Sequence, residues 1–153
     1  MSIEVADILT PARTLSAVNV TSKKKLLELL ASVVAEEVEG SSADDIFDRL
    51  LGRERLGSTG IGSGIAIPHC RLRQCEQAVG VLLHLQESID FDAIDHKPVD
   101  LVFALLVPEE ATGDHLQILA TLARNFSDND YCDRLRDATG DEQLYLHAIK
   151  SVG

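Results

Sequence analysis

Apolar residues recur at helical spacing in the first third of the chain. The segment 22–38 carries such a stripe, with Thr21 or Ser22 placed to cap its first turn. A second helix is predicted over 43–53, where Ser42 and an aspartate three residues later have the spacing of a capping box. The sequence therefore begins with two amphipathic helices.

The apolar pattern then changes from helical spacing to that of strands. Residues 64–69 alternate, residues 78–85 form a short apolar run, and residues 99–108 are continuously apolar between prolines. An uninterrupted run of this length is typical of a central strand that is buried on both faces. A short early strand is also predicted near residues 17–20.

Helical spacing returns after the strands. It predicts a helix over about 114–126, a shorter helix capped by Ser127 and reaching about residue 137, and a last helix that opens at Asp141 and carries Val152. Because helices at both ends of the chain must cover the strands between them, the order of elements predicts an α/β (α+β) fold. Its mixed β-sheet is expected to lie between helices on both sides.

The composition fits one globular domain, predicted to span residues 1–153. Hydrophobic residues make up 45% of the chain, and the formal charge is −11. Nucleic acids and anionic membranes favour basic faces, so this charge argues against both as partners. No stretch approaches the ~18 apolar residues of a membrane span, and the N-terminus lacks a signal-peptide pattern. The three cysteines lack metal-type spacing and are expected to be reduced, which predicts a soluble cytoplasmic protein.

A glycine-rich segment leads into the first strand-like stretch and ends in Pro-His-Cys. Residues 57–70 have the sequence GSTGIGSGIAIPHC. Glycines let a chain turn tightly and approach a phosphate with its N–H groups, but they are also common in ordinary turns. The segment is not a nucleotide-binding P-loop, since no Gly-Lys-Ser/Thr follows and it leads into a strand. Both a phosphate site and a plain glycine turn stay open at this point.

Several side chains are candidates for phosphate chemistry. His69 follows Pro68, whose ring stiffens the backbone and helps to hold an imidazole in one orientation. His115 begins a helix, where free N–H groups favour an anion, although a first-turn histidine on a surface helix is common too. Arg53 and Arg55 offer donors for phosphate oxygens, but arginines at helix ends are also favoured by the helix dipole.

The same residues could in principle form two other kinds of site, a metal site or a thiol–imidazole pair. A metal site would need ligands assembled over long range, since no His-x-x-x-His or clustered carboxylate–histidine spacing occurs. A thiol–imidazole pair of Cys70 and His69 is opposed by strand geometry, because neighbouring residues on a strand point to opposite faces. Neither a metal nor another cofactor is predicted.

The segment RERLGSTGIGSGIAIPH, residues 53–69, resembles the phosphorylation motif of the enzyme IIA proteins of the phosphotransferase system, mannitol/fructose class. Its LGSTGIG part is most similar to the nitrogen-regulatory branch, and residues 89–128 resemble the same family throughout. The likeness therefore covers nearly the whole chain. It implies an α/β sandwich with helices on both sides of a mixed sheet.

This resemblance implies a role for each candidate residue of a phosphotransferase component. His69 takes a phosphoryl group, through Nε2, from the phosphohistidine of a small carrier protein, HPr or its nitrogen-branch relative NPr. His115 lies beside His69, and Arg53 corresponds to the family arginine. The residues expected to hold the phosphoryl oxygens in the glycine segment are Ser58, Thr59, Gly62, Ser63 and Gly64.

The resemblance also implies a task that is mainly regulatory rather than metabolic. The phosphorylation state controls which proteins are bound in nitrogen- and potassium-related regulation, with potassium transporters or sensor kinases as expected targets. The alternative is a sugar-specific protein of the fructose/mannitol type, in which His69 passes the phosphate to an enzyme IIB. Two positions depart from the family pattern. Ser63 stands where asparagine is frequent, and Cys70 where glycine is frequent, so the backbone after His69 is expected to differ slightly.

Overall fold

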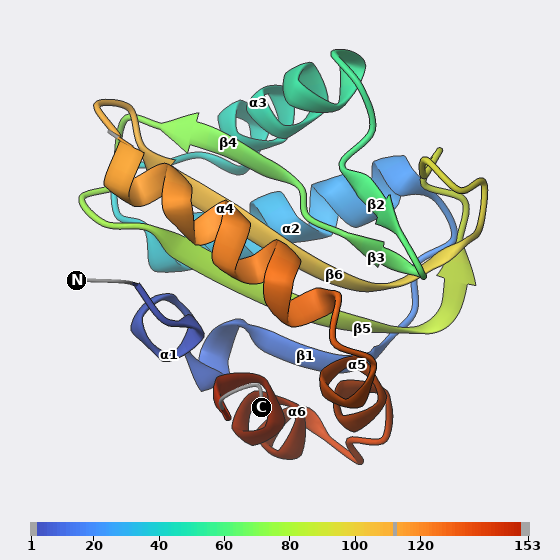
Figure 1. Ribbon diagram of the computed structural model, residues 1–153. Coiled ribbons are helices and arrows are strands. Elements are labelled where there is room, and N and C mark those ends of the chain that lie inside the picture. Colours follow the sequence, from blue (N-terminus) through green and yellow to red (C-terminus); the bar gives the residue numbers. More distant parts are fainter. Residues whose placement is uncertain (1–2, 112, 151–153) are drawn as a thin grey trace.

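A mixed six-stranded sheet lies between two layers of helices (Figure 1). The computed structural model of the protein describes residues 3–111 and 113–150, apart from the side chains of residues 114–116. The predicted fold class, a mixed sheet with helices on both sides, is confirmed. In chain order the elements are α1 (Val5–Ile8), the 3-10 helix η1 (Pro11–Arg13), β1 (Thr14–Val18), α2 (Lys23–Glu37), α3 (Ala43–Arg55), β2 (Gly60–Gly62), β3 (Ile65–Ala66), β4 (His69–Leu72), β5 (Val79–Ile89), β6 (Val99–Pro108), α4 (Gly113–Phe126), α5 (Asn129–Arg136) and α6 (Asp141–Ile149).

Strand β6 is the centre of the sheet. The strand order is β1-β5-β6-β3-β2, and β4 also pairs with β6. Strand β5 lies antiparallel along one edge of β6, so that β3 and β4 share the other edge, both parallel to it. Ile65 in β3 is opposite Leu101, and His69 in β4 is opposite Leu105. The two short strands therefore follow each other along β6 instead of lying side by side.

Alternate side chains of β6 supply two separate cores. Leu101, Phe103 and Leu105 face the core covered by α1, α4, α5 and α6. Val102, Ala104 and Leu106 face the core covered by α2 and α3 (Figure 1). All six residues are at most 1% exposed, so the prediction of a central strand buried on both faces is confirmed.

Helices α2 and α3 form where the apolar periodicity predicts them. Of the two candidate caps of α2, Ser22 is the one used, and its Oγ accepts the Lys25 N–H at 3.1 Å. Ser42 caps α3 in the same way, accepting the N–H of Asp45 at 3.1 Å. The expected return contact from Asp45 is replaced, because its carboxylate accepts a hydrogen bond from Arg49 Nε at 3.2 Å.

The strand predicted over 64–69 is divided in two. Strand β3 ends at Ala66, and β4 begins at His69 and continues beyond the predicted segment. Pro68 lies between them and has no N–H to donate to a ladder. Its carbonyl still accepts the N–H of Leu105 at 2.8 Å, which starts the pairing of β4. The proline thus separates a short strand in the glycine segment from the strand that carries the histidine.

Several other boundaries differ from the predictions. The early strand is β1, a few residues before the predicted position, and β5 extends past the predicted segment to Ile89. The N-cap of α5 is Asp128, whose carboxylate accepts the Tyr131 N–H at 2.9 Å, while the Ser127 hydroxyl donates back to the carbonyl of Arg124. The predicted helix position Val152 lies outside the described residues.

Candidate functional site

The imidazole of His69 is held by the backbone at the start of β4. Its Nδ1 lies 2.8 Å from the carbonyl oxygen of Ile67. A carbonyl oxygen can only accept a hydrogen bond, so Nδ1 carries the proton and donates it. This assignment leaves Nε2 with a free electron pair in the neutral ring. The backbone therefore selects one tautomer of a half-buried histidine.

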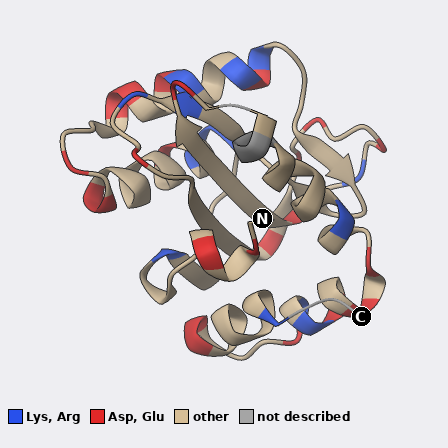
Figure 2. Cartoon of the chain, turned by 60° about the vertical axis from the view of Figure 1, so that its left-hand side comes forward, with Lys and Arg blue, Asp and Glu red and all other residues tan. Residues whose placement is uncertain are grey.

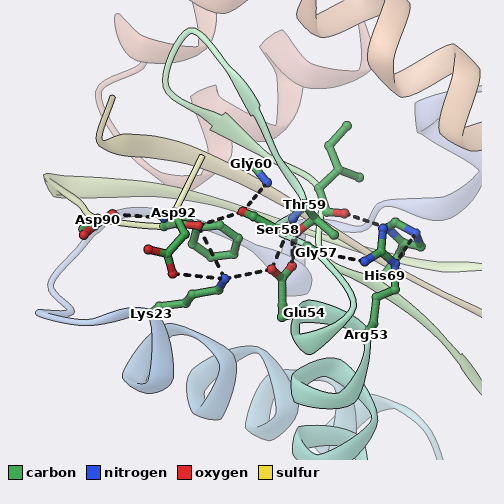
Figure 3. A network of polar contacts seen from close by, with 12 residues as sticks. Lys23, Arg53, Glu54, Gly57, Ser58, Thr59, Gly60, His69, Asp90 and Asp92 are labelled. Atoms are coloured by element: carbon green, nitrogen blue, oxygen red, sulfur yellow. Dashed lines mark hydrogen bonds and ion pairs between the residues drawn. The ribbon is translucent and has the colours of Figure 1, made fainter. Parts of the chain in front are cut away.

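Arg53 in the last turn of α3 approaches the other ring nitrogen. Its Nε donates to His69 Nε2 at 3.3 Å, and its Nη1 donates to the carbonyl of Gly57 at 2.8 Å (Figure 3). The contact at Nε2 requires that nitrogen to be an acceptor, which agrees with the tautomer set by Ile67. The structure thus brings together two residues expected to take part in the site, with the guanidinium held at both ends.

A pocket of about 340 Å³ opens beside this pair. Its polar walls include three arginines, Arg49, Arg53 and Arg71, together with His69. Among the side chains that the structure describes, no lining residue carries a carboxylate, and the remaining described surface is largely apolar. Guanidinium groups present planar sets of donors that match phosphate and carboxylate oxygens. The pocket is therefore suited to a small anion next to the imidazole.

The sequence patterns alone do not single out Arg49 and Arg71. Arg49 precedes Arg53 by one helical turn on the same side of α3, and Arg71 is two residues beyond His69 on the same side of β4. Arg71 Nη1 also donates to two carbonyls of the segment 109–111, at 2.9 and 3.0 Å. The helical spacing from Arg53 could have indicated Arg49, and the strand spacing from His69 could have indicated Arg71.

Charge is distributed unevenly along α3. Acidic residues lie in its first turn and basic residues in its last turn (Figure 2). This order complements the helix dipole, because acidic side chains favour the N-terminal end of a helix and basic side chains the C-terminal end. It places the basic last turn of α3 beside His69. Of the two arginines predicted near the glycine segment, only Arg53 faces the pocket. Arg55 is exposed and has no side-chain hydrogen bond within the described residues.

The hydroxyls of Ser58 and Thr59 are bound to partners inside the protein. Ser58 Oγ donates to the carbonyl of Phe91 at 2.7 Å and accepts the N–H of Gly60 at 3.0 Å. Thr59 is 5% exposed, and both its N–H and its Oγ1 donate to the carboxylate of Glu54 (Figure 3). These residues, expected to hold phosphoryl oxygens, fasten the glycine segment to the fold.

The other predicted phosphate-binding residues lie farther along the sheet. The register places Ile65 opposite Leu101 and His69 opposite Leu105, four residues apart along β6. This separation is about 13 Å at the usual rise of a strand. Gly62, Ser63 and Gly64 precede Ile65, so the structure does not bring them to the imidazole.

The turn at Gly62, Ser63 and Gly64 has its own partners. All three residues have positive φ, 103°, 58° and 82° respectively. The Ser63 N–H donates to Asp95 Oδ2 at 2.9 Å and its carbonyl accepts from Arg136 Nη2 at 2.9 Å. The Ser63 N–H holds the pKa of the Asp95 carboxyl below its ordinary value. The turn therefore joins the β2–β3 hairpin to a loop and to α5.

Gly60 lies where a side chain does not fit. A Cβ atom there would be 2.8 Å from the Ala93 Cβ and 2.9 Å from its Cα. We expect Gly60→Ala to lower the free energy of unfolding by about 1–3 kcal/mol, because the backbone of Ala93 must retreat. Urea unfolding followed by circular dichroism measures this change.

The matched control for that substitution is Gly52→Ala. Gly52 lies within α3, and nothing is within 4 Å of a Cβ there. We expect this variant to gain about 0.5–1 kcal/mol, because alanine favours a helix over glycine. Unchanged stability of Gly60→Ala would mean that Ala93 is free to move.

Two features are absent from the part of the chain that the structure describes. Among the side chains described, no three histidine, cysteine, aspartate or glutamate residues come together so that they could hold a metal ion. Within residues 3–111 and 113–150, no helix has the length and apolar character needed to cross a membrane.

Nearly the whole chain matches one known protein family. A family model described as "Phosphoenolpyruvate-dependent sugar phosphotransferase system, EIIA 2" matches residues 7–151. The chain belongs to this EIIA family. Its membership makes it a IIA component of the phosphotransferase system, and the predicted resemblance to the nitrogen-regulatory branch is confirmed by the relatives that follow.

Proteins similar to this EIIA chain include regulatory and sugar-specific members. The nitrogen regulatory protein of Pseudomonas aeruginosa is 50% identical over 143 residues, 94% of this chain and 93% of the relative. The crystal structure of nitrogen regulatory protein IIA-Ntr from Neisseria meningitidis has 40% sequence identity and a TM-score of 0.87, covering 94% of this chain and 98% of that one. The fructose-specific EIIA component of Haloferax volcanii is 34% identical over 139 residues, 89% of this chain and 90% of the relative.

Cys70, where the EIIA family often has glycine, lies in regular strand. Cys70 is a β4 residue opposite Leu106 of β6, and it is not among the described residues with positive φ. Burial raises the pKa of the Cys70 thiol from 9.0 to about 12, so the thiol stays protonated at neutral pH. The next residue after His69 therefore needs no glycine and offers no reactive thiolate.

His115, the second histidine expected from the EIIA family, lies in the first turn of α4. Its side chain is outside the described residues, so the structure gives no contact for it. The backbone before α4 is held close to β4, because Arg71 donates to the carbonyls of Glu109 and Ala111. The start of this helix is thus tied to the strand that carries His69.

Proposed function

We propose that His69 accepts a phosphoryl group on Nε2 from the phosphohistidine of a small carrier protein, HPr or NPr. The observation that carries this proposal is the hydrogen bond from Nδ1–H to the Ile67 carbonyl. It leaves the electron pair of Nε2 as the nucleophile, directed toward the pocket lined by three arginines.

The transfer exchanges one nitrogen–phosphorus bond for another. The Nε2 electron pair attacks phosphorus in line while the bond to the donor nitrogen breaks. The donor ring, protonated on its other nitrogen, leaves as neutral imidazole with the electron pair of the broken bond. His69 keeps its proton on Nδ1, and the Ile67 carbonyl stabilises the positive charge that the ring acquires. No metal or nucleotide takes part in this scheme.

Arg53 has a part in both states of the ring. Its Nε–H rests on the Nε2 electron pair, 3.3 Å away, so it must leave this nitrogen when the phosphorus approaches. The same group then donates to a phosphoryl oxygen, while Nη1 stays on the Gly57 carbonyl. Arg49 and Arg71 add positive charge to the pocket, which stabilises the phosphoryl group during transfer.

The phosphorylation state then controls which regulatory proteins bind. We place the chain in the nitrogen-regulatory branch because it is 50% identical to a nitrogen regulatory protein and 34% identical to a fructose-specific component. Potassium transporters and sensor kinases are the proposed targets. The sugar-specific alternative, supported by the second relative, differs in passing the phosphate on to an enzyme IIB.

The test is phosphorylation of the purified chain with phosphoenolpyruvate, enzyme I and the carrier. We expect one acid-labile phosphate per chain, and a nitrogen–phosphorus coupling in NMR spectra that assigns it to Nε2 of His69. A phosphate on another residue, or on Nδ1, would contradict the proposal. Purified IIB proteins are then added to the phosphorylated chain, and rapid transfer to one of them would favour the sugar-specific alternative.

His115 is proposed to donate to a phosphoryl oxygen from the first turn of α4. We expect His115→Gln to lower the rate of phosphorylation about 10-fold while the phosphate still forms on His69, because the transition state loses one hydrogen bond worth about 1.5 kcal/mol. The control is His96→Asn, an exposed turn histidine with φ 60°, which should keep the wild-type rate. Equal rates for His115→Gln and the wild type would remove His115 from the site.

A further inference from the structure

Glu54 is a buried carboxylate next to Arg53 in the sequence. Its side chain is only 2% exposed, and it neither lines the pocket nor touches the imidazole. A charged group in such a place needs close partners, because burial without them is costly. The partners of Glu54 show what this carboxylate holds in place.

Three donors converge on the Glu54 carboxylate. The Thr59 N–H lies 3.2 and 3.3 Å from its two oxygens, and the Thr59 hydroxyl donates to Oε1. Lys23 Nζ from α2 forms an ion pair with Oε2 at 2.9 Å. The same ammonium lies 4.5 Å from the centre of the Phe91 ring. The carboxylate is therefore fully engaged between α2 and the glycine segment.

One arm of this network leads to the imidazole. Glu54 fixes the backbone at Thr59, whose carbonyl accepts the Ile67 N–H at 3.0 Å. The carbonyl of Ile67 in turn accepts Nδ1–H of His69 at 2.8 Å. The position of the group that selects the tautomer thus depends on where Thr59 is held.

A second arm leads to the guanidinium. The N–H of Gly57 donates to the backbone carbonyl of Glu54 at 3.1 Å, and the Gly57 carbonyl accepts Arg53 Nη1 at 2.8 Å. The short segment between Gly57 and Thr59 is thereby fixed at both ends by Glu54, through its backbone and through its side chain. Glu54 therefore contacts both residues, Thr59 and Gly57, that lead to the groups bound to His69.

We propose that Glu54 is the positioning residue of the site, setting the His69 tautomer through Thr59 and the Arg53 guanidinium through Gly57. This inference rests on the proposed role of His69 as phosphoryl acceptor. It assigns Glu54 an action on the rate of transfer rather than on carrier binding, because the carboxylate is buried and does not line the pocket.

The proposal requires a carboxylate and not an amide. The Thr59 N–H and the Lys23 ammonium can only donate, and glutamine offers them one acceptor oxygen in place of two. In Glu54→Gln the Lys23 ammonium holds the amide oxygen, so the NH₂ group turns toward Thr59, whose hydroxyl must then accept a hydrogen bond instead of donating one. Removal of the competing ammonium by Lys23→Met frees the amide oxygen for Thr59, so the double variant should recover part of the positioning.

The experiment combines NMR of the His69 ring with kinetics of phosphorylation. In Glu54→Gln we expect ¹⁵N shifts that report a mixture of the two neutral tautomers, a kcat about 10-fold lower, and an unchanged KM for the phosphorylated carrier. Lys23→Met combined with Glu54→Gln should return the tautomer and bring kcat to within about 3-fold of wild type. The control is Glu37→Gln, which removes the partner of Arg13, an ion pair of 3.2 Å elsewhere on α2.

A second variant with a smaller change keeps the test valid if Glu54→Gln does not fold. Thr59→Val removes only the hydroxyl donor and keeps the N–H contact with Glu54, and it should shift the tautomer and kcat in the same direction by about 3-fold. Wild-type ring shifts and wild-type kcat in either folded variant would overturn the proposal, as would a lower melting temperature with no change at the ring. The ring shifts do not depend on phosphoryl transfer, so a wild-type chain that takes up no phosphate overturns only the proposed function.

Discussion

Replacement of His69 by alanine should remove phosphorylation completely. We expect the rate of labelling by the carrier to fall at least ~10³-fold, to background, because no other described residue combines a free imidazole nitrogen with the arginine-lined pocket. Labelling with radioactive phosphoenolpyruvate in the presence of enzyme I and the carrier measures the loss. The phosphate on the wild type should be labile in acid and stable in alkali.

The His69→Ala result needs evidence that the variant is folded. His69 is half-buried at the start of β4, so the circular dichroism spectrum and melting curve of the variant should stay close to those of the wild type. His96→Asn, an exposed turn histidine, should label at the wild-type rate. Acid-labile phosphate that persists in His69→Ala would disprove the assignment of the acceptor.

Loss of Arg53 should have the second-largest effect. We expect Arg53→Ala to lower kcat for phosphorylation about 10²–10³-fold, or about 3–4 kcal/mol of transition-state stabilisation, because the variant loses a fixed donor to the phosphoryl group. Rapid-quench measurements with phosphorylated carrier give this rate. Arg53→Lys should recover only a small part, since one ammonium cannot bind the Gly57 carbonyl and the phosphoryl group as the guanidinium does.

Arg55 provides the matched control on the same helical turn. It is exposed and forms no side-chain hydrogen bond among the residues described. Arg55→Ala changes the charge of the chain by the same amount as Arg53→Ala and should keep kcat within about 2-fold of wild type. A similar loss in both variants would show that net positive charge matters rather than the placement of Arg53.

The helices and the central strand could be predicted because their signals are local. The stripes of α2 and α3 and the apolar run of β6 each depend on residues within one element. The division of the predicted strand at Pro68 could also have been predicted, since proline has no N–H to donate to a neighbouring strand. The placement of β3 and β4 along the same edge of β6 could not, because it depends on pairing with residues far away in the chain.

The site was predictable only in part, for the same reason. His69 and Arg53 belong to one recognisable motif, and the structure brings them together. The hydroxyls of Ser58 and Thr59 are polar residues in a glycine segment, which is equally typical of phosphate binding and of internal fastening. In the structure, the Ser58 hydroxyl donates to the carbonyl of Phe91 and the Thr59 hydroxyl donates to the carboxylate of Glu54. The local sequence pattern does not indicate these acceptors, because they reach the hydroxyls only when the chain folds.

The contacts around the imidazole make the proposed phosphorylation of His69 depend on the folded state. The tautomer, the guanidinium and the start of α4 are fixed by three segments, residues 53–59, 67–71 and 109–111, which meet only in the complete sheet. In a chain that has not assembled β4 against β6, His69 is an ordinary histidine with both tautomers and no arginine beside it. In the proposed transfer, the carrier would therefore phosphorylate native molecules selectively. Misfolded copies of the chain would stay unphosphorylated.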